Sequence, residues 1–110
     1  MSIDFRASPR PTLGVEWEFA LVDKATRDLS NTAAELFESV RRHEGTDVPR
    51  LHKELLRNTI EVVTGTCDSV DEAVEDLTGT LRLVRDLADD LGVDLYSAGT
   101  HPFAHWAAQL

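Results

Sequence analysis

One stretch of the chain reads LGVEWEFALV, from Leu13 to Val22, and its alternating pattern decides the fold. Alternate positions are apolar, and the positions between them hold two glutamates flanked by small residues. The apolar set is Leu13, Val15, Trp17, Phe19 and Leu21, and the other set is Gly14, Glu16, Glu18 and Ala20. Because successive side chains of a strand point to opposite faces, this pattern predicts a half-buried β-strand.

Working outward, the next regular segment has apolar residues at helical spacing from Asn31 to about His43. Thr32 and Glu35 have the spacing of a capping box at its start. Gly45 is suited to end it. We therefore predict a first helix here.

The clearest helical pattern runs from about Val70 to Leu91, where an apolar stripe persists for more than five turns. Ser69 and Glu72 form a second candidate capping box before it. Gly92 is a natural stop, because glycine adopts the left-handed geometry found just beyond helix ends. This segment predicts a long amphipathic helix.

Three further segments complete the order of elements. The segment from Val48 to Gly65 is β-prone in its second half and predicts a hairpin, and Val93 to Ser97 predicts a short strand followed by a tight loop at Gly99–Pro102. Residues 1–12 form an irregular lead-in. The order strand, helix, hairpin, helix, strand predicts an α+β fold with a mainly antiparallel sheet and helices packed on one face.

Composition excludes several classes of protein. The net charge of −9 argues against a nucleic-acid partner, because phosphate binding needs clustered Lys and Arg. No apolar run reaches the ~20 residues that span a bilayer, and the N-terminus lacks the apolar core of a secretory signal. A single cysteine, Cys67, cannot form an internal disulfide and is expected to be a packed, buried thiol. These features predict a cytoplasmic protein that does not associate with membranes.

The two glutamates of the first strand are the first candidate site residues. Glu16 and Glu18 share one face and lie roughly 7 Å apart at about 3.3 Å rise per residue. Gly14 and Ala20 leave room above them for a ligand. The alternative interpretation is an ordinary amphipathic strand whose glutamates face solvent.

A second pair of glutamates belongs to the predicted hairpin. If Arg57 and Asn58 form a two-residue turn, Glu54 lies directly opposite Glu61, with Cβ atoms about 5 Å apart. Two carboxylates at that distance repel each other unless a cation lies between them. The alternative is that Glu54 is one more exposed charge.

His101, in the loop after the last predicted strand, is a third candidate, although a lone histidine is commonly structural. Four glutamates and one histidine on strands or strand ends could converge on one face of a sheet. Carboxylate oxygens favour Mg²⁺ or Mn²⁺ over zinc. Several such ions would suit phosphoryl transfer from ATP, because they bridge phosphates and neutralise developing charge.

Three motifs in order resemble one known family: TLGVEWEFALVD, HKELLRNTIEVVTGTC and LYSAGTHPFAHW. They resemble the carboxylate–amine ligase family that includes type 2 glutamate–cysteine ligases. The resemblance covers essentially the whole chain after the lead-in. It implies a glutamine-synthetase-like catalytic fold, in which an antiparallel sheet holds the metals and ATP.

The resemblance also implies roles for particular residues. Glu16, Glu54 and Glu61 would hold one Mg²⁺ or Mn²⁺ ion, and Glu18 with His101 would hold a second. Thr100 is a weaker candidate for the substrate site. The implied reaction uses ATP to phosphorylate the side-chain carboxylate of glutamate, after which an amine, usually that of cysteine, attacks the acyl phosphate. A homo-oligomer is compatible with this family.

The length of 110 residues is small for such a ligase, so we expect residues 1–110 to be the N-terminal segment of one larger catalytic domain, inactive alone. The main alternative is a non-catalytic module that binds divalent cations or a partner through the same carboxylates. Glycoside hydrolysis by a glutamate pair is a further alternative, because Glu16 and Glu18 fall within the required separation. Few aromatic residues are available to line a sugar cleft.

Overall fold

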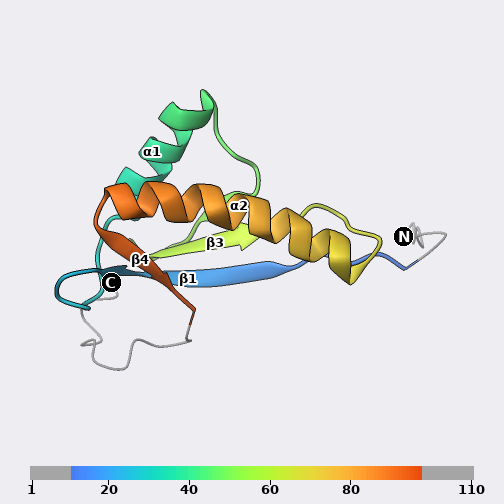
Figure 1. Ribbon diagram of the computed structural model, residues 1–110, viewed down its shortest axis with the longest axis horizontal. Helices are drawn as coiled ribbons and strands as arrows, with labels where there is room; N and C mark the ends of the chain where they lie inside the picture. Colours follow the sequence, from blue (N-terminus) through green and yellow to red (C-terminus); the bar gives the residue numbers. More distant parts are fainter. Residues whose placement is uncertain (1–10, 98–110) are drawn as a thin grey trace, which may run out of the picture.

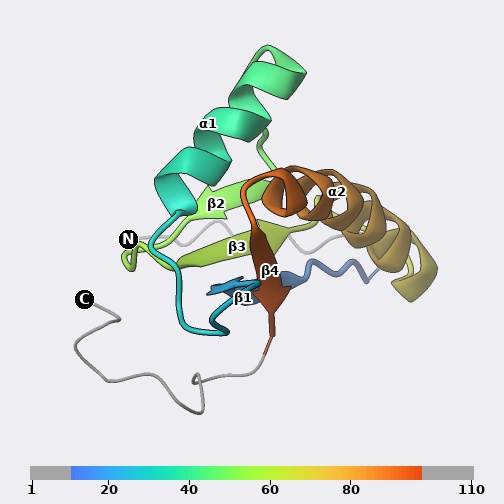
Figure 2. The ribbon, with the colours of Figure 1, turned by 60° about the vertical axis from the view of Figure 1, so that its left-hand side comes forward.

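The computed structural model describes residues 11–97. They form a four-stranded antiparallel sheet in the order β2-β3-β1-β4, together with two helices. The elements are β1 (Glu16–Asp23), α1 (Ala33–Glu44), β2 (Leu51–Lys53), β3 (Thr59–Val63), α2 (Val70–Asp90) and β4 (Val93–Tyr96). Both helices lie over the same face of the sheet (Figures 1 and 2). The predicted α+β class, order of elements and antiparallel pairing are confirmed.

Strand β1 lies at the centre of the sheet, between β3 and β4. The second half of its apolar face enters the core, with Phe19 6% exposed and Leu21 fully buried. Trp17, which the alternation placed on the buried face, is 40% exposed. The strand begins at Glu16 rather than Leu13 because the Thr64 hydroxyl accepts the Val15 N–H at 3.0 Å and interrupts the ladder. Leu13 forms an isolated bridge with Cys67, whose buried thiol agrees with the prediction of a packed cysteine.

Helix α2 has a fully formed N-terminus. The Ser69 hydroxyl accepts the Glu72 N–H at 3.2 Å, as expected for an N-cap. The Glu72 carboxylate accepts the N–H of Asp68 at 2.7 Å, one residue before the position that a capping box would use. After the helix, Gly92 adopts φ +74°, so the predicted stop is confirmed.

Helix α1 ends as predicted but begins differently. Gly45 adopts φ +77° and donates its N–H to the Arg41 carbonyl. At the other end, Thr32 occupies the N-cap position without a side-chain hydrogen bond to the helix, so the predicted capping box is wrong. Instead, the Ala33 N–H donates to the Arg57 carbonyl at 3.0 Å. A contact from the β2–β3 loop therefore satisfies the first N–H group of this helix.

The β2–β3 hairpin exists, but its predicted two-residue turn is wrong. His52 rather than Glu54 lies opposite Glu61, so the register differs by two residues and the loop covers residues 54–58. A type I′ turn needs positive φ at both central positions, and neither Arg57 nor Asn58 has it. Asn58 is 1% exposed, and its carbonyl accepts the Leu21 N–H at 2.7 Å. Tertiary contacts, not turn geometry, therefore set the loop.

The core lies between the sheet and the two helices. It includes fully buried side chains from each layer, among them Leu21, Leu36, Ile60, Val62 and Val84. Their burial removes apolar surface from water at roughly 25 cal/mol per Å². Within residues 11–97, neither helix is long and apolar enough to cross a membrane.

Candidate metal centre

The sheet face opposite the helices carries the glutamates. In β1 the positions that alternate with the buried Phe19 and Leu21 are Glu16, Glu18 and Ala20. Glu18 pairs directly with Glu61 of β3, so both side chains project from the same face. Phe19 beside Glu18, and Ile60 and Val62 on either side of Glu61, are buried in the core, so the alternation fixes both glutamates on the open face.

Three carboxylates meet on this face. Glu18, Glu54 and Glu61 each offer one oxygen, and these oxygens lie within 4.8 Å of one another. Across residues 11–97, this is the one group of three or more acidic, histidine or cysteine side chains that meets that condition. We call these three residues the carboxylate triad. Three hard oxygen donors at this separation suit a divalent ion such as Mg²⁺ or Mn²⁺.

Glu54 reaches the triad from the β2–β3 loop rather than from a strand. Its position depends on the loop's anchors, which are the buried Asn58 and the backbone bond from Ala33 to Arg57. Glu54 is half-buried, whereas Glu18 is exposed. The loop thus holds a carboxylate over the strand pair and partly shields it from water.

The electrostatics of the triad favour a positive ligand. Burial raises the pKa of the Glu54 carboxyl above its ordinary value, and a hydrogen bond and the negative charge of Glu61 raise that pKa further. The nearby His52 acts in the opposite direction. The surroundings of Glu54 therefore disfavour its negative charge when no cation is present. A bound divalent cation would offset the repulsion between these carboxylates.

Glu16 lies outside the triad. Its cross-strand partner is Val63, two residues along β3 from Glu61. It lines a neighbouring hollow of about 530 Å³ together with Gly14, Val15, His52, Val63 and Thr64. The predicted room beside the glutamates is therefore present, next to Glu16.

Comparisons with known proteins agree on one family. The sequence signature described as Glutamate-cysteine ligase family 2 (GCS2) matches residues 12–110. The chain belongs to this family. A protein of Rhodococcus jostii (strain RHA1), named as a candidate glutamate–cysteine ligase 2-2, is 61% identical over 110 residues, which cover 100% of this chain and 29% of that protein. A protein of the same name from Nocardia farcinica (strain IFM 10152) is 60% identical over 111 residues, covering 98% of this chain and 29% of its own length.

The chain therefore spans less than a third of the length of these glutamate–cysteine ligase family 2 relatives. The resemblance noted from the three motifs is confirmed at the level of the family. The described residues supply the β1 and hairpin motifs of that resemblance and the start of the third. His101 and Thr100, the candidates in the third motif, lie outside the described residues.

The grouping of ligands within this family segment differs from the one that the resemblance implied. That grouping joined Glu16 to Glu54 and Glu61, whereas the structure brings Glu18 to them. The reason is the register, which places Glu18 opposite Glu61 and shifts Glu16 toward the Val63 end of the strand pair. Glu16 shares the face and stays a predicted metal ligand.

One residue beside the site was not predicted from the sequence. His52 lies opposite Glu61, with Nδ1 3.7 Å from the Glu61 carboxylate, and it also lines the hollow that contains Glu16. It therefore lies beside Glu61 of the triad and beside the hollow that contains Glu16. The sequence did contain a signal for His52, because it lies two residues before Glu54 and alternate residues of an extended segment share a face.

Proposed function

We propose that this chain is the metal-binding N-terminal part of an ATP-dependent ligase with a glutamine-synthetase-like catalytic fold. The ligase would join the side-chain carboxylate of glutamate to an amine, that of cysteine, through an acyl phosphate, giving γ-glutamylcysteine. Family membership supports the class of reaction, and the names of the relatives support the two amino-acid substrates. The observation that carries the proposal is the convergence of Glu18, Glu54 and Glu61 on the open sheet face.

The residues present fit a divalent cation. Their donors are carboxylate oxygens within 4.8 Å of one another. Burial, and after it the neighbouring Glu61 carboxylate, raises the pKa of Glu54, and a cation would neutralise the charge of Glu61. Bound Mg²⁺ or Mn²⁺ would neutralise the charge that develops as the γ-phosphoryl group leaves ATP. Glu18, Glu54 and Glu61 would hold such an ion against the sheet, with Glu16 and His52 beside it.

The arrangement of the chain's own groups suits this role. Glu18 and Glu61 are on adjacent, hydrogen-bonded strands, so the spacing between their backbones is set by the sheet. Such preorganisation matters because catalysis of phosphoryl transfer consists mainly of positioning and electrostatic stabilisation. The remaining length of the ligase would supply the other groups that contact ATP and the amino acids.

The test is Glu61→Gln in the full-length ligase, with phosphate release measured in the presence of ATP, glutamate and a panel of amines that includes cysteine. We expect turnover to fall by about 10²-fold or more, because the substitution removes one anionic ligand while keeping side-chain size. The exposed α1 residue Glu38 provides a matched control through Glu38→Gln, which should leave turnover unchanged. Near-normal turnover of the Glu61 variant would contradict the proposal.

The same assay separates the ligase from a non-catalytic cation-binding module. If wild-type full-length protein releases no phosphate with any amine yet binds Mn²⁺, the module interpretation replaces the ligase. For the 110-residue chain alone we expect Mn²⁺ binding without turnover, because the rest of the ATP site lies elsewhere in the longer protein.

A further inference from the structure

His52 lies at the end of a row of side chains that crosses the open face of the sheet. It pairs with Glu61 of β3, and Glu61 pairs in turn with Glu18 of β1. Because directly opposed residues of adjacent strands project from the same face, these three side chains form one line across β2, β3 and β1. Glu61 therefore has another carboxylate of the triad on one side and an imidazole on the other.

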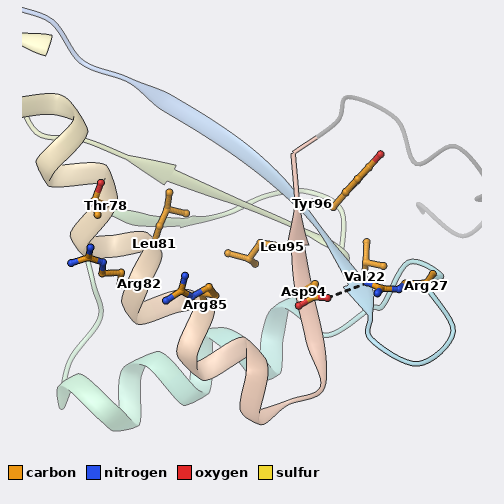
Figure 3. A pocket seen from close by; sticks show the side chains of 9 residues that line it. All are labelled: Val22, Arg27, Thr78, Leu81, Arg82, Arg85, Asp94, Leu95 and Tyr96. Atoms are coloured by element: carbon orange, nitrogen blue, oxygen red, sulfur yellow. Dashed lines mark hydrogen bonds and ion pairs between the residues drawn. The ribbon is translucent and has the colours of Figure 1, made fainter. Parts of the chain in front are cut away.

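The charge of the hollows around the sheet indicates where a cation would be tolerated. The hollow of about 620 Å³ between α2 and β4 has arginines in its walls, and Figure 3 shows two of them, Arg82 and Arg85, on α2. Their positive charge repels a divalent cation. The hollow of about 530 Å³ beside Glu16 has no lysine or arginine among the described residues that line it, and one of those residues is His52. His52 thus lies next to both the triad and a hollow whose charge suits a cation.

The distances around His52 indicate an indirect role for this histidine. Its Nδ1 lies 3.7 Å from the Glu61 carboxylate, which is its one ion-pair partner among residues 11–97. His52 is not part of the group whose donor atoms lie within 4.8 Å of one another. The row explains this, because His52 is two strand spacings, or about 10 Å, from Glu18 along the backbone positions of the sheet. His52 can therefore reach Glu61 but not the centre of the triad.

The chemistry of the two groups allows His52 to orient Glu61. A carboxylate has two oxygens, so Glu61 can bind a cation with one and accept a hydrogen bond with the other. The His52 side chain is 52% exposed on an edge strand, whereas that of Glu61 is 18% exposed. A small rotation of the imidazole can therefore shorten the separation to the length of an N–H···O bond, about 2.9 Å. Both neutral and protonated imidazole can donate from Nδ1, so this contact needs no change of protonation.

We infer that His52 is a positioning residue for the cation site. Its Nδ1–H donates to Glu61 and turns that carboxylate toward the ion held by the triad, while the imidazole itself does not contact the ion. Hydrogen bonds of this kind to ligating carboxylates change metal affinity by about 10- to 100-fold. This inference rests on the cation site of the proposed function, and it assigns to His52 a part of the affinity of that site.

The test is Mn²⁺ binding to the 110-residue chain, measured from the electron paramagnetic resonance signal of the free ion. His52→Ala should raise Kd about tenfold, the lower end of the range, because the side chain is half-exposed. His52→Asn should recover most of the affinity, since its amide nitrogen lies close to the place of Nδ1 and donates the same bond. The matched control is His43→Ala on α1, where Nδ1 of His43 lies 3.5 Å from the Glu44 carboxylate. It should leave Kd unchanged.

Electron spin-echo spectra of the bound Mn²⁺ distinguish orientation from direct ligation. They should show no imidazole nitrogen signal that His52→Ala removes, and such a signal would overturn the inference by making His52 a ligand. An unchanged Kd in His52→Ala, or no recovery in His52→Asn, would also overturn it while leaving the cation site and the ligase proposal in place. If the wild type binds no Mn²⁺, or if Glu61→Gln keeps full affinity, the proposed cation site is wrong and this inference fails with it.

Discussion

The two faces of strands β1 and β3 differ although they are built from neighbouring residues. On the helix side, Leu21, Ile60 and Val62 are fully buried and join the core. On the open side, Glu18 and Glu61 come together with Glu54. Because side chains alternate between the two faces, one strand can contribute to the core and to the carboxylate triad. A substitution on one face leaves the side chains of the other face in place. Stability and cation binding should be separable by mutation.

The largest effect should come from the helix side. Ile60→Ala removes a side chain with 0% exposure between two residues of the open face, and we expect it to lower the free energy of unfolding by about 2–5 kcal/mol. Ile60→Val, the matched control, should cost about 0.5–1.5 kcal/mol. Denaturant unfolding of the 110-residue chain measures both. A loss below 1 kcal/mol for the alanine variant would show that this face does not carry the stability.

A smaller effect should come from the junction between β3 and α2. Asp76 accepts the Gly65 N–H at 2.8 Å and lies 3.2 Å from the Arg50 guanidinium. Asp76→Asn should lower the free energy of unfolding by about 2 kcal/mol at neutral pH, because it weakens both contacts. Asp86→Asn, at an exposed position of α2, is the control and should be nearly neutral.

The Asp76 contribution should also depend on pH. The Gly65 N–H holds the pKa of Asp76 below its ordinary value of 3.8, Arg50 lowers that pKa further, and burial partly opposes both. A carboxyl group whose pKa is lower in the folded state stabilises the fold at pH values above its unfolded-state pKa. That stabilisation is lost as the pH falls below about 3.8. The difference in free energy of unfolding between wild type and Asp76→Asn should therefore become smaller as the pH falls from 4 to 2. A gap that is constant over this range would contradict the assignment.

Most of the fold could be predicted from the sequence because periodicity reports burial directly. The alternation around Phe19 and Leu21 identified β1, and the long apolar stripe with Ser69 and Gly92 identified α2. Errors arose where long-range contacts override local signals. The Arg57–Asn58 turn was wrong because Asn58 is held by β1, and the α1 cap was wrong because Arg57 supplies the contact.

The candidate site was predicted as a set of residues but not as a geometry. The alternation of side chains along a strand correctly placed Glu16, Glu18 and Glu61 on one face. A register shift of two residues does not change the face on which a side chain lies. The alternation could not say which glutamates converge, because that depends on the register of β1 with β3 and on the loop that carries Glu54. His52 was missed for the same reason, since its position opposite Glu61 follows from the true hairpin register.

The most direct test of the account is a Mn²⁺ and Mg²⁺ titration of the 110-residue chain, followed by thermal unfolding. At a free cation concentration about tenfold above Kd, binding should stabilise the wild type by about 1.4 kcal/mol, which raises Tm by several degrees. Glu61→Gln should lose this rise, whereas the α1 control Glu38→Gln should keep it. No rise in the wild type, or the same rise in all three proteins, would contradict the claim that Glu18, Glu54 and Glu61 form a cation site.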